Sequence, residues 1–212
     1  VEENAKAAID ARGHFALAVP GGSVAKALAG LKDAKGIDWE KVHVFFVNER
    51  VPDGKCFKLA CETWASDVPI PPENVHACVH GGAVAEEAAA YEAALRALGP
   101  DVVPIDEVNG LPVLDLVLLG MGADGHVGSI YPGSDALADE SGAAILGVDM
   151  PTKRSVTMSM GLINTAERVV VAASGVGKAE TVRRALEEDD EMLPVSSVDA
   201  FSTIWFLDLG AA

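Results

Sequence analysis

The stretch "LDLVLLGMGADGHVGSIYPG", residues Leu114–Gly133, starts as an apolar run and changes abruptly into a glycine-rich turn. Apolar residues that follow one another without alternation are typical of a strand covered on both faces, as in a parallel sheet. Two further stretches have the same character, "VHVFFVN" (Val42–Asn48) and "RVVVAAS" (Arg168–Ser174). The strand in Leu114–Gly133 and the one at Arg168–Ser174 each end in a glycine-containing turn, so the pattern indicates strand–turn–helix units.

Strands and helices are expected to alternate along most of the chain. Further strands are expected at His14–Pro20 and Thr203–Asp208. Helices are expected at Val1–Arg12, Val24–Leu31, Phe57–Ser66 and Ala83–Leu98. This order predicts the α/β class: a Rossmann-like, doubly wound, mostly parallel sheet with helices on both faces, in a single domain over residues 1–212.

Two side-chain expectations accompany these helices. Ser23 directly precedes Val24–Leu31 and is expected to be its N-cap, because a hydroxyl can accept a free backbone N–H of the first turn. In Ala83–Leu98 the alanines, the leucines and Tyr91 share one face. The glutamates on the other side are expected to face solvent; they are Glu86, Glu87 and Glu92.

The composition limits the class of partner. Half of the 212 residues are hydrophobic, which is enough for one core, and no apolar run approaches the roughly 18 residues of a membrane span. The net charge of −16 argues against nucleic acid and anionic membranes as partners, because binding there depends on clusters of Lys and Arg. The chain shows no targeting signal at its polar start, so the cytoplasm is the expected compartment, with an organellar form left open.

The cysteines give no sign of a metal or redox centre. Cys56, Cys61 and Cys78 form no CxxC pair, and the first two are five residues apart in one expected helix. They are therefore expected to be buried thiols in a reducing compartment and not part of a metal or redox centre.

Three turns that follow strands carry groups suited to an anion. Gly21, Gly22 and Ser23 open a helix, Asn48-Glu49-Arg50 ends the second strand, and Lys178 lies in the first turn of a late helix. Each also has an ordinary structural interpretation as a tight turn or a surface charge. However, ligands of an open parallel sheet bind at the carboxyl ends of its strands, so these turns are expected to face one cleft.

The glycines of the opening stretch match G-x-G-x-x-G at Gly120–Gly125, the pattern of a dinucleotide-binding turn. That site needs an acidic residue about 20 positions later at the end of a strand, whereas Asp139 and Glu140 lie in "SDALADESG", which is no strand. The match is therefore interpreted as coincidence. Asp124 and His126 favour a catalytic turn instead, since a histidine oriented by a carboxylate can act as a general base near neutral pH.

The remaining histidines lack such a setting. They are expected to be structural or solvated, and they are His14, His43, His76 and His80.

Five segments in this order resemble the 6-phosphogluconolactonase family, which is related to glucosamine-6-phosphate deaminases: "FALAVPGGSVAKAL", "FFVNERV", "LDLVLLGMGADGHVGSIYPG", "SVTMSMGLINTAERVVVAASGVGKAE" and "WFLDLGAA". The resemblance runs from Phe15 to the C-terminus, and its most specific parts are D-G-H with the following S-x-x-P-G, and G-x-G-K-A. It implies a modified Rossmann-like fold that hydrolyses 6-phospho-D-glucono-1,5-lactone to 6-phosphogluconate without a metal or coenzyme. The implied partner is this small phosphorylated sugar lactone, and we expect a monomer or weak homodimer.

By the same resemblance, His126 is the catalytic histidine and Asp124 lies beside it. The implied substrate- and phosphate-binding residues are Gly21, Gly22, Ser23, Asn48, Arg50 and Lys178. His126 would deprotonate a water that attacks C1 and return the proton to the ring oxygen. Backbone N–H groups of residues 122–125 are candidates for stabilising the developing oxyanion.

The chain departs from the family pattern on the substrate side. Pro20-Gly21-Gly22-Ser23-Val24-Ala25 stands for S-G-G-S-T-P, Asn48 replaces an aspartate, the loop after Arg50 is short, and Arg154 is displaced by one position. D-G-H and G-x-G-K-A are intact, so a divergent but active lactonase is expected. A non-catalytic sugar-phosphate-binding relative is the main alternative. An amino-sugar-phosphate deaminase or isomerase is a weaker one, because that chemistry needs a carboxylate where Asn48 stands.

Overall fold

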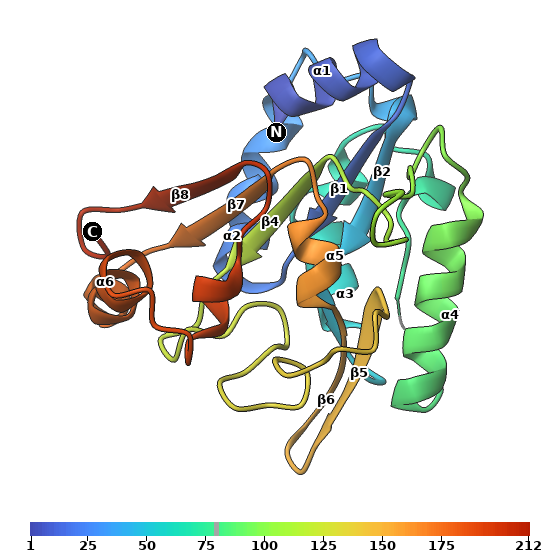
Figure 1. The fold of residues 1–212 in the computed structure, drawn as a ribbon. Coiled ribbons are helices and arrows are strands. Elements are labelled where there is room, and N and C mark those ends of the chain that lie inside the picture. Colours follow the sequence, from blue (N-terminus) through green and yellow to red (C-terminus); the bar gives the residue numbers. More distant parts are fainter. Residues whose placement is uncertain (79–80) are drawn as a thin grey trace.

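The computed structural model describes residues 1–78 and 81–212, and its centre is a parallel sheet of five strands (Figure 1). The strands lie in the order β2 (Val42–Phe46), β1 (Phe15–Val19), β4 (Leu116–Gly120), β7 (Val169–Ala173) and β8 (Thr203–Leu207). All pairings within this sheet are parallel. Every residue of β1 and β2 is buried, as the uninterrupted apolar sequences predict.

The strand order contains a reversal between β1 and β4. The chain passes from β1 to β2 on one side and then returns to place β4 on the other side of β1. This is the flavodoxin-like variant of the doubly wound sheet, in which connections leave the two adjacent strands in opposite directions. A crevice therefore opens at the carboxyl ends of β1 and β4, where Pro20–Ser23 and Gly120–His126 follow the strands.

A second, antiparallel sheet was not predicted. It consists of β3 (Asn48–Arg50), β6 (Lys153–Met158) and β5 (Ile145–Met150), in that order. The expected strand at Val42–Asn48 is confirmed over Val42–Phe46, but its end is wrong, because the chain changes sheets at Val47. The N–H of Val47 donates to the Val19 carbonyl (3.0 Å), and its carbonyl accepts from the Met158 N–H (2.7 Å), so this residue bonds to both sheets.

Six α-helices surround the sheets among the described residues: α1 (Glu2–Arg12), α2 (Gly22–Ala27), α3 (Lys55–Thr63), α4 (Val84–Ala97), α5 (Met160–Asn164) and α6 (Ala179–Glu187). In Figure 1, the β5–β6 hairpin extends away from the parallel sheet, and α4 packs against both of its strands. The predicted α/β class with a mostly parallel sheet is confirmed. No helix of the described residues combines the length and the apolar character needed to cross a membrane.

Two side-chain expectations for the helices are wrong. Gly21 is the N-cap of α2, no side chain caps this helix, and Ser23 falls inside its first turn because the helix begins directly at Gly22. The helix is also shorter than expected and continues as a 3-10 helix over Leu28–Asp33. Glu87 is buried rather than solvated, and its carboxylate accepts a hydrogen bond from the N–H of Gly82, the residue that leads into α4.

The carboxylate of Glu49 on β3 is fully buried and holds the start of α3. One oxygen accepts the N–H groups of Arg50 (2.7 Å) and Cys56 (2.8 Å), and the other accepts the N–H of Phe57 (2.8 Å). A negative charge at a helix N-terminus satisfies free donors and interacts favourably with the helix dipole. Glu49 therefore fixes β3 against α3, with Asn48 and Arg50 on either side of it.

Three histidines cluster at the amino ends of β1 and β2. His43 Nδ1 lies 3.1 Å from His76 Nε2, and the His14 ring meets the His43 ring edge-on at 5.3 Å. Burial, followed by the neighbouring His76 and His14, lowers the pKa of His43 to about 4. Burial also lowers the pKa of His76. These three agree with the expected structural role, while His80 lies outside the described residues.

We expect Glu49→Gln to lower the free energy of unfolding by about 1.5–3 kcal/mol. The substitution keeps the shape but removes the charge and one of the acceptors for three backbone N–H groups. Urea denaturation measures the change. Glu62→Gln on the exposed side of the same helix is the matched control, expected to change stability by less than about 0.5 kcal/mol. Equal losses for the two variants would contradict the role given to Glu49.

We also expect stability to fall as the pH drops from about 6.5 towards about 4. In this window the unfolded chain protonates His43 whereas the folded chain does not, so protons favour unfolding. The loss is expected to be of order 1–3 kcal/mol. His43→Gln keeps a hydrogen-bonding group and cannot titrate, so urea denaturation across this range should give a flatter pH dependence. An unchanged slope in the variant would show that His43 does not cause it.

Candidate functional site

A cavity of about 500 Å³ lies at the crevice between β1 and β4. It collects residues from segments that are far apart in the sequence. Seven of the eight predicted site residues line it, namely Gly21, Gly22, Ser23, Asn48, Arg50, His126 and Lys178. Asp124 is not part of the lining and lies against His126. The expectation that the three strand-end turns face one cleft is therefore confirmed.

The charge of this cavity is opposite to that of the chain. Among the described residues, its lining includes the cations Arg50, Lys55 and Lys178 and no Asp or Glu, although the chain has 32 acidic residues. Lys55 pairs with Asp53 at its rim (3.3 Å). Neither Arg50 nor Lys178 forms an ion pair with a described residue. Two cations that form no ion pair with a described residue are suited to holding an anion, although the charge of Lys178 also acts on the Asp208 carboxyl.

Asp124 and His126 form a hydrogen-bonded pair at the edge of the cavity. His126 Nδ1 lies 2.6 Å from Asp124 Oδ1, and the His126 backbone N–H donates to the same oxygen (3.2 Å). Partial burial raises the pKa of Asp124, but the bonds from His126 together outweigh it and leave the pKa below its usual value. An ionised carboxylate only accepts, so Nδ1 carries the proton and Nε2 of the neutral ring keeps a free lone pair. This is the tautomer that a general base requires.

The glycines of this turn make room for the histidine. A Cβ atom at Gly122 would overlap Nδ1 of His126 and Oδ1 of Asp124. No helix begins anywhere in the segment 121–159, whereas a dinucleotide-binding turn opens directly into one. The interpretation of G-x-G-x-x-G as coincidental is confirmed. Two candidate oxyanion donors are occupied, because the N–H of Gly122 donates to His126 O and that of Gly125 to Gly122 O.

Sequence reasoning missed two residues of the site. Tyr131 lines the cavity and packs its ring against the His126 ring, with centroids 4.7 Å apart, while Lys153 Nζ lies 4.1 Å above the Tyr131 ring. Lys55, at the start of α3, supplies the additional cation. Tyr131 was visible in the sequence as the third residue of S-x-x-P-G, two positions before the end of the stretch Leu114–Gly133. No local signal reveals Lys55, because its place depends on how Glu49 holds α3.

Asn48 connects β3 to the glycine-rich stretch. Its Nδ2 donates to the hydroxyl of the buried Ser129 (3.0 Å), whose N–H donates in turn to Thr157 Oγ1 (3.1 Å). The amide that replaces the family's aspartate is thus hydrogen-bonded in place. Arg154, by contrast, lies on β6 and faces Asp149 at 3.5 Å, outside the cavity lining.

Cys56 also lines the cavity but is unsuited to nucleophilic catalysis. Burial, followed by the nearby Glu49 carboxylate, raises the pKa of its thiol to about 12, so it remains protonated at neutral pH. Cys56 and Cys61 do share one helix, as expected. Within residues 1–78 and 81–212, no three His, Cys, Asp or Glu side chains are grouped in a way that could hold a metal ion.

Comparison with known proteins places this geometry in a family. The sequence pattern of the family described as "Glucosamine-6-phosphate isomerases/6-phosphogluconolactonase" matches residues 1–205. The chain is 39% identical over 215 aligned residues to "6-phosphogluconolactonase 3, chloroplastic" of Arabidopsis thaliana, an alignment that includes 95% of the chain. It spans 65% of that relative's length, and 66% of the length of a similar protein of Oryza sativa subsp. indica.

Solved structures agree with the sequence comparison. The 6-phosphogluconolactonase of Leishmania guyanensis superimposes with a TM-score of 0.77 at 29% identity, covering 97% of this chain and 89% of that one. The strand order, the cavity at the switch point and these similarities over nearly the whole chain lead to one conclusion. The chain belongs to the glucosamine-6-phosphate isomerase/6-phosphogluconolactonase family.

Proposed function

We propose that the chain hydrolyses 6-phospho-D-glucono-1,5-lactone to 6-phospho-D-gluconate. The observation that carries this proposal is a cavity that joins two cations, which form no ion pair with a described residue, to a histidine–carboxylate pair in a strongly acidic chain. The names of the plant and Leishmania relatives support the same substrate.

The cations give the phosphate an anchor at one side of the cavity. Arg50 offers a planar set of N–H donors and Lys178 a point charge, while the Ser23 hydroxyl adds a neutral donor. A phosphate held there leaves the lactone ring within the same hollow as His126. Anchoring at a group that does not react orients the carbonyl, and positioning of this kind lowers the barrier without further chemistry.

The proposed reaction uses His126 first as a base and then as an acid. Nε2 removes a proton from water as the water oxygen bonds to C1, and the carbonyl oxygen becomes an oxyanion. The tetrahedral intermediate then collapses, the bond between C1 and the ring oxygen breaks, and the imidazolium returns its proton to that oxygen. Asp124 stabilises the imidazolium through Nδ1. Water is the only co-reactant, so the reaction needs no metal or coenzyme.

The two alternatives differ from this proposal in what the site must contain. A deaminase or isomerase moves a carbon-bound proton and requires a carboxylate base, whereas Asn48 is an amide that donates to Ser129. A binding protein would retain the cations but have no use for the Asp124–His126 pair. Turnover of fresh 6-phosphogluconolactone by the pure protein, well above spontaneous opening, separates the lactonase from both. We retain the cytoplasm as the proposed compartment, while the word "chloroplastic" in the plant names supports an organellar one.

His126→Ala is expected to lower kcat by about 10² to 10⁴, the usual contribution of general acid–base assistance. Binding of 6-phosphogluconate should remain within a few-fold of the wild type, because the cations are untouched. The assay couples lactone hydrolysis to 6-phosphogluconate dehydrogenase and subtracts spontaneous opening. His43→Gln, at the opposite end of the parallel strands, is the matched histidine control and should keep full activity. Full activity in His126→Ala would rule out the proposed mechanism.

Lys178→Ala is expected to raise KM for the phosphorylated lactone by roughly 10- to 100-fold, since a charge-assisted hydrogen bond contributes about 1.5–3 kcal/mol. Hydrolysis of unphosphorylated glucono-1,5-lactone should not change. Lys26→Ala removes the same charge from an exposed position on α2 and should leave KM unchanged. An equal effect on both lactones would mean that Lys178 does not bind the phosphate.

A further inference from the structure

The turn that carries Asp124 and His126 is exposed at its tip. Ala123 and Asp124 are both exposed, and the turn is closed internally by bonds from Gly122 N to His126 O and from Gly125 N to Gly122 O. Bonds within a turn fix its shape but not its position relative to the cavity. Its position must therefore come from contacts with other elements.

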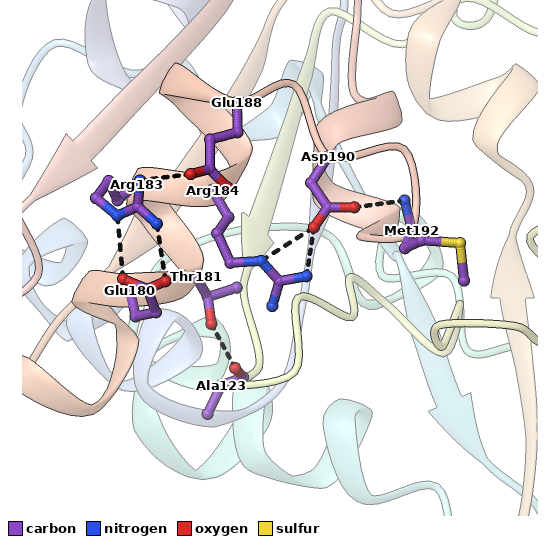
Figure 2. A network of polar contacts seen from close by, with 8 residues as sticks. All are labelled: Ala123, Glu180, Thr181, Arg183, Arg184, Glu188, Asp190 and Met192. Carbon is purple, nitrogen blue, oxygen red and sulfur yellow. Dashed lines mark hydrogen bonds and ion pairs between the residues drawn. The ribbon is translucent and has the colours of Figure 1, made fainter.

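Helix α6 provides one such contact. The hydroxyl of Thr181 donates to the carbonyl oxygen of Ala123 at 2.6 Å, and Thr181 is only 7% exposed. A helical threonine often bonds to a carbonyl in its own preceding turn. Here the hydroxyl reaches a segment 58 residues earlier in the chain, next to Asp124. Figure 2 shows this bond between the helix and the turn.

The segment that follows α6 provides a second contact. Val195 N donates to Gly125 O (3.0 Å), and a Cβ atom at Gly125 would lie 2.9 Å from Leu193, so this segment packs directly on the turn. Arg184 of α6 pairs with Asp190, whose carboxylate also accepts the N–H of Met192 (3.0 Å; Figure 2). The Arg184–Asp190 ion pair thus joins α6 to the segment that follows it, and both contact the turn.

Helix α6 also begins at the phosphate side of the cavity. Lys178 lines the cavity and immediately precedes Ala179, the first residue of the helix. Thr181 follows Lys178 by three residues, so the two side chains are about one turn apart. The N-cap of α6 is therefore a candidate phosphate ligand, and the first turn of the helix carries a bond to the candidate catalytic turn.

We propose that Thr181 is a positioning residue for the Asp124–His126 pair, and that its hydroxyl fixes the pair relative to the phosphate anchor Lys178, which directly precedes the same helix. The kinetic part of this inference rests on the proposed lactonase function. The geometric part concerns only the bond to Ala123 and its effect on His126.

The test compares Thr181→Val with Thr181→Ser. Valine keeps the shape and lacks the hydroxyl, whereas serine keeps the hydroxyl. Thr181→Val is expected to lower kcat about 10-fold with KM within twofold, because a small misplacement of the catalytic pair slows the chemistry while the cations still bind. Thr181→Ser should retain at least half of the wild-type kcat. Arg183→Ala, which removes exposed ion pairs with Glu180 and Glu188 on the same helix, should leave kcat unchanged.

The result that would overturn the proposal is a kcat for Thr181→Val within twofold of the wild type, an equal loss in both variants, or a change in KM alone. Should valine prevent folding, Thr181→Ala takes its place.

A second readout does not depend on activity. The NMR signals of the His126 imidazole should shift in Thr181→Val and remain at their wild-type positions in Thr181→Ser. Absence of lactonase activity in the wild type would overturn the proposed function alone. Unchanged His126 signals in Thr181→Val would overturn the positioning role.

Discussion

The arrangement of the site depends on one buried carboxylate. Moving the charge of Glu49 out of water is unfavourable by several kcal/mol, and it is tolerated because three backbone N–H groups surround it. Two of these donors belong to the first turn of α3, so the interaction joins β3 to that helix. The same contact sets where Arg50 and Lys55 emerge at the cavity. The buried negative charge of Glu49 thereby helps to position the positive charges of Arg50 and Lys55 at the cavity.

The sequence predicted those parts of the fold that rest on local composition. β1, β2, β4 and β7 are continuous apolar runs, and α4 has a long periodic pattern, so each is recognisable without its partners. The β3–β6–β5 sheet was missed in part because β3 has only three residues, all of them polar: Asn48, Glu49 and Arg50. The burial of Glu87 was missed for a related reason, since its contact with Gly82 is formed by the chain's path into α4.

The sequence predicted most residues that line the cavity, but not the residues that hold them in place. Candidate residues lie in turns after strands, and the topology of an open parallel sheet brings such turns together whatever their sequence separation. Tyr131 and Thr181 escaped notice because their roles depend on contacts with His126 and Ala123. Lys55 escaped notice because its place depends on how Glu49 holds the start of α3. The glycine pattern also shows that spacing alone does not determine the role of a residue. Its spacing is that of a nucleotide-binding turn, yet Gly122 serves here to admit an imidazole ring.

The contrast between a cationic cavity and a chain of net charge −16 has a consequence for turnover. Opening a lactone converts a neutral carbonyl into a carboxylate, so the product of the proposed reaction carries one more negative charge than the substrate. The negative electrostatic potential of the acidic surface then repels the product more strongly than the substrate. This repulsion acts over roughly 10 Å, the distance beyond which salt screens it. Local cations would retain the phosphate during the reaction, and the surrounding field would favour the departure of the product once the ring has opened.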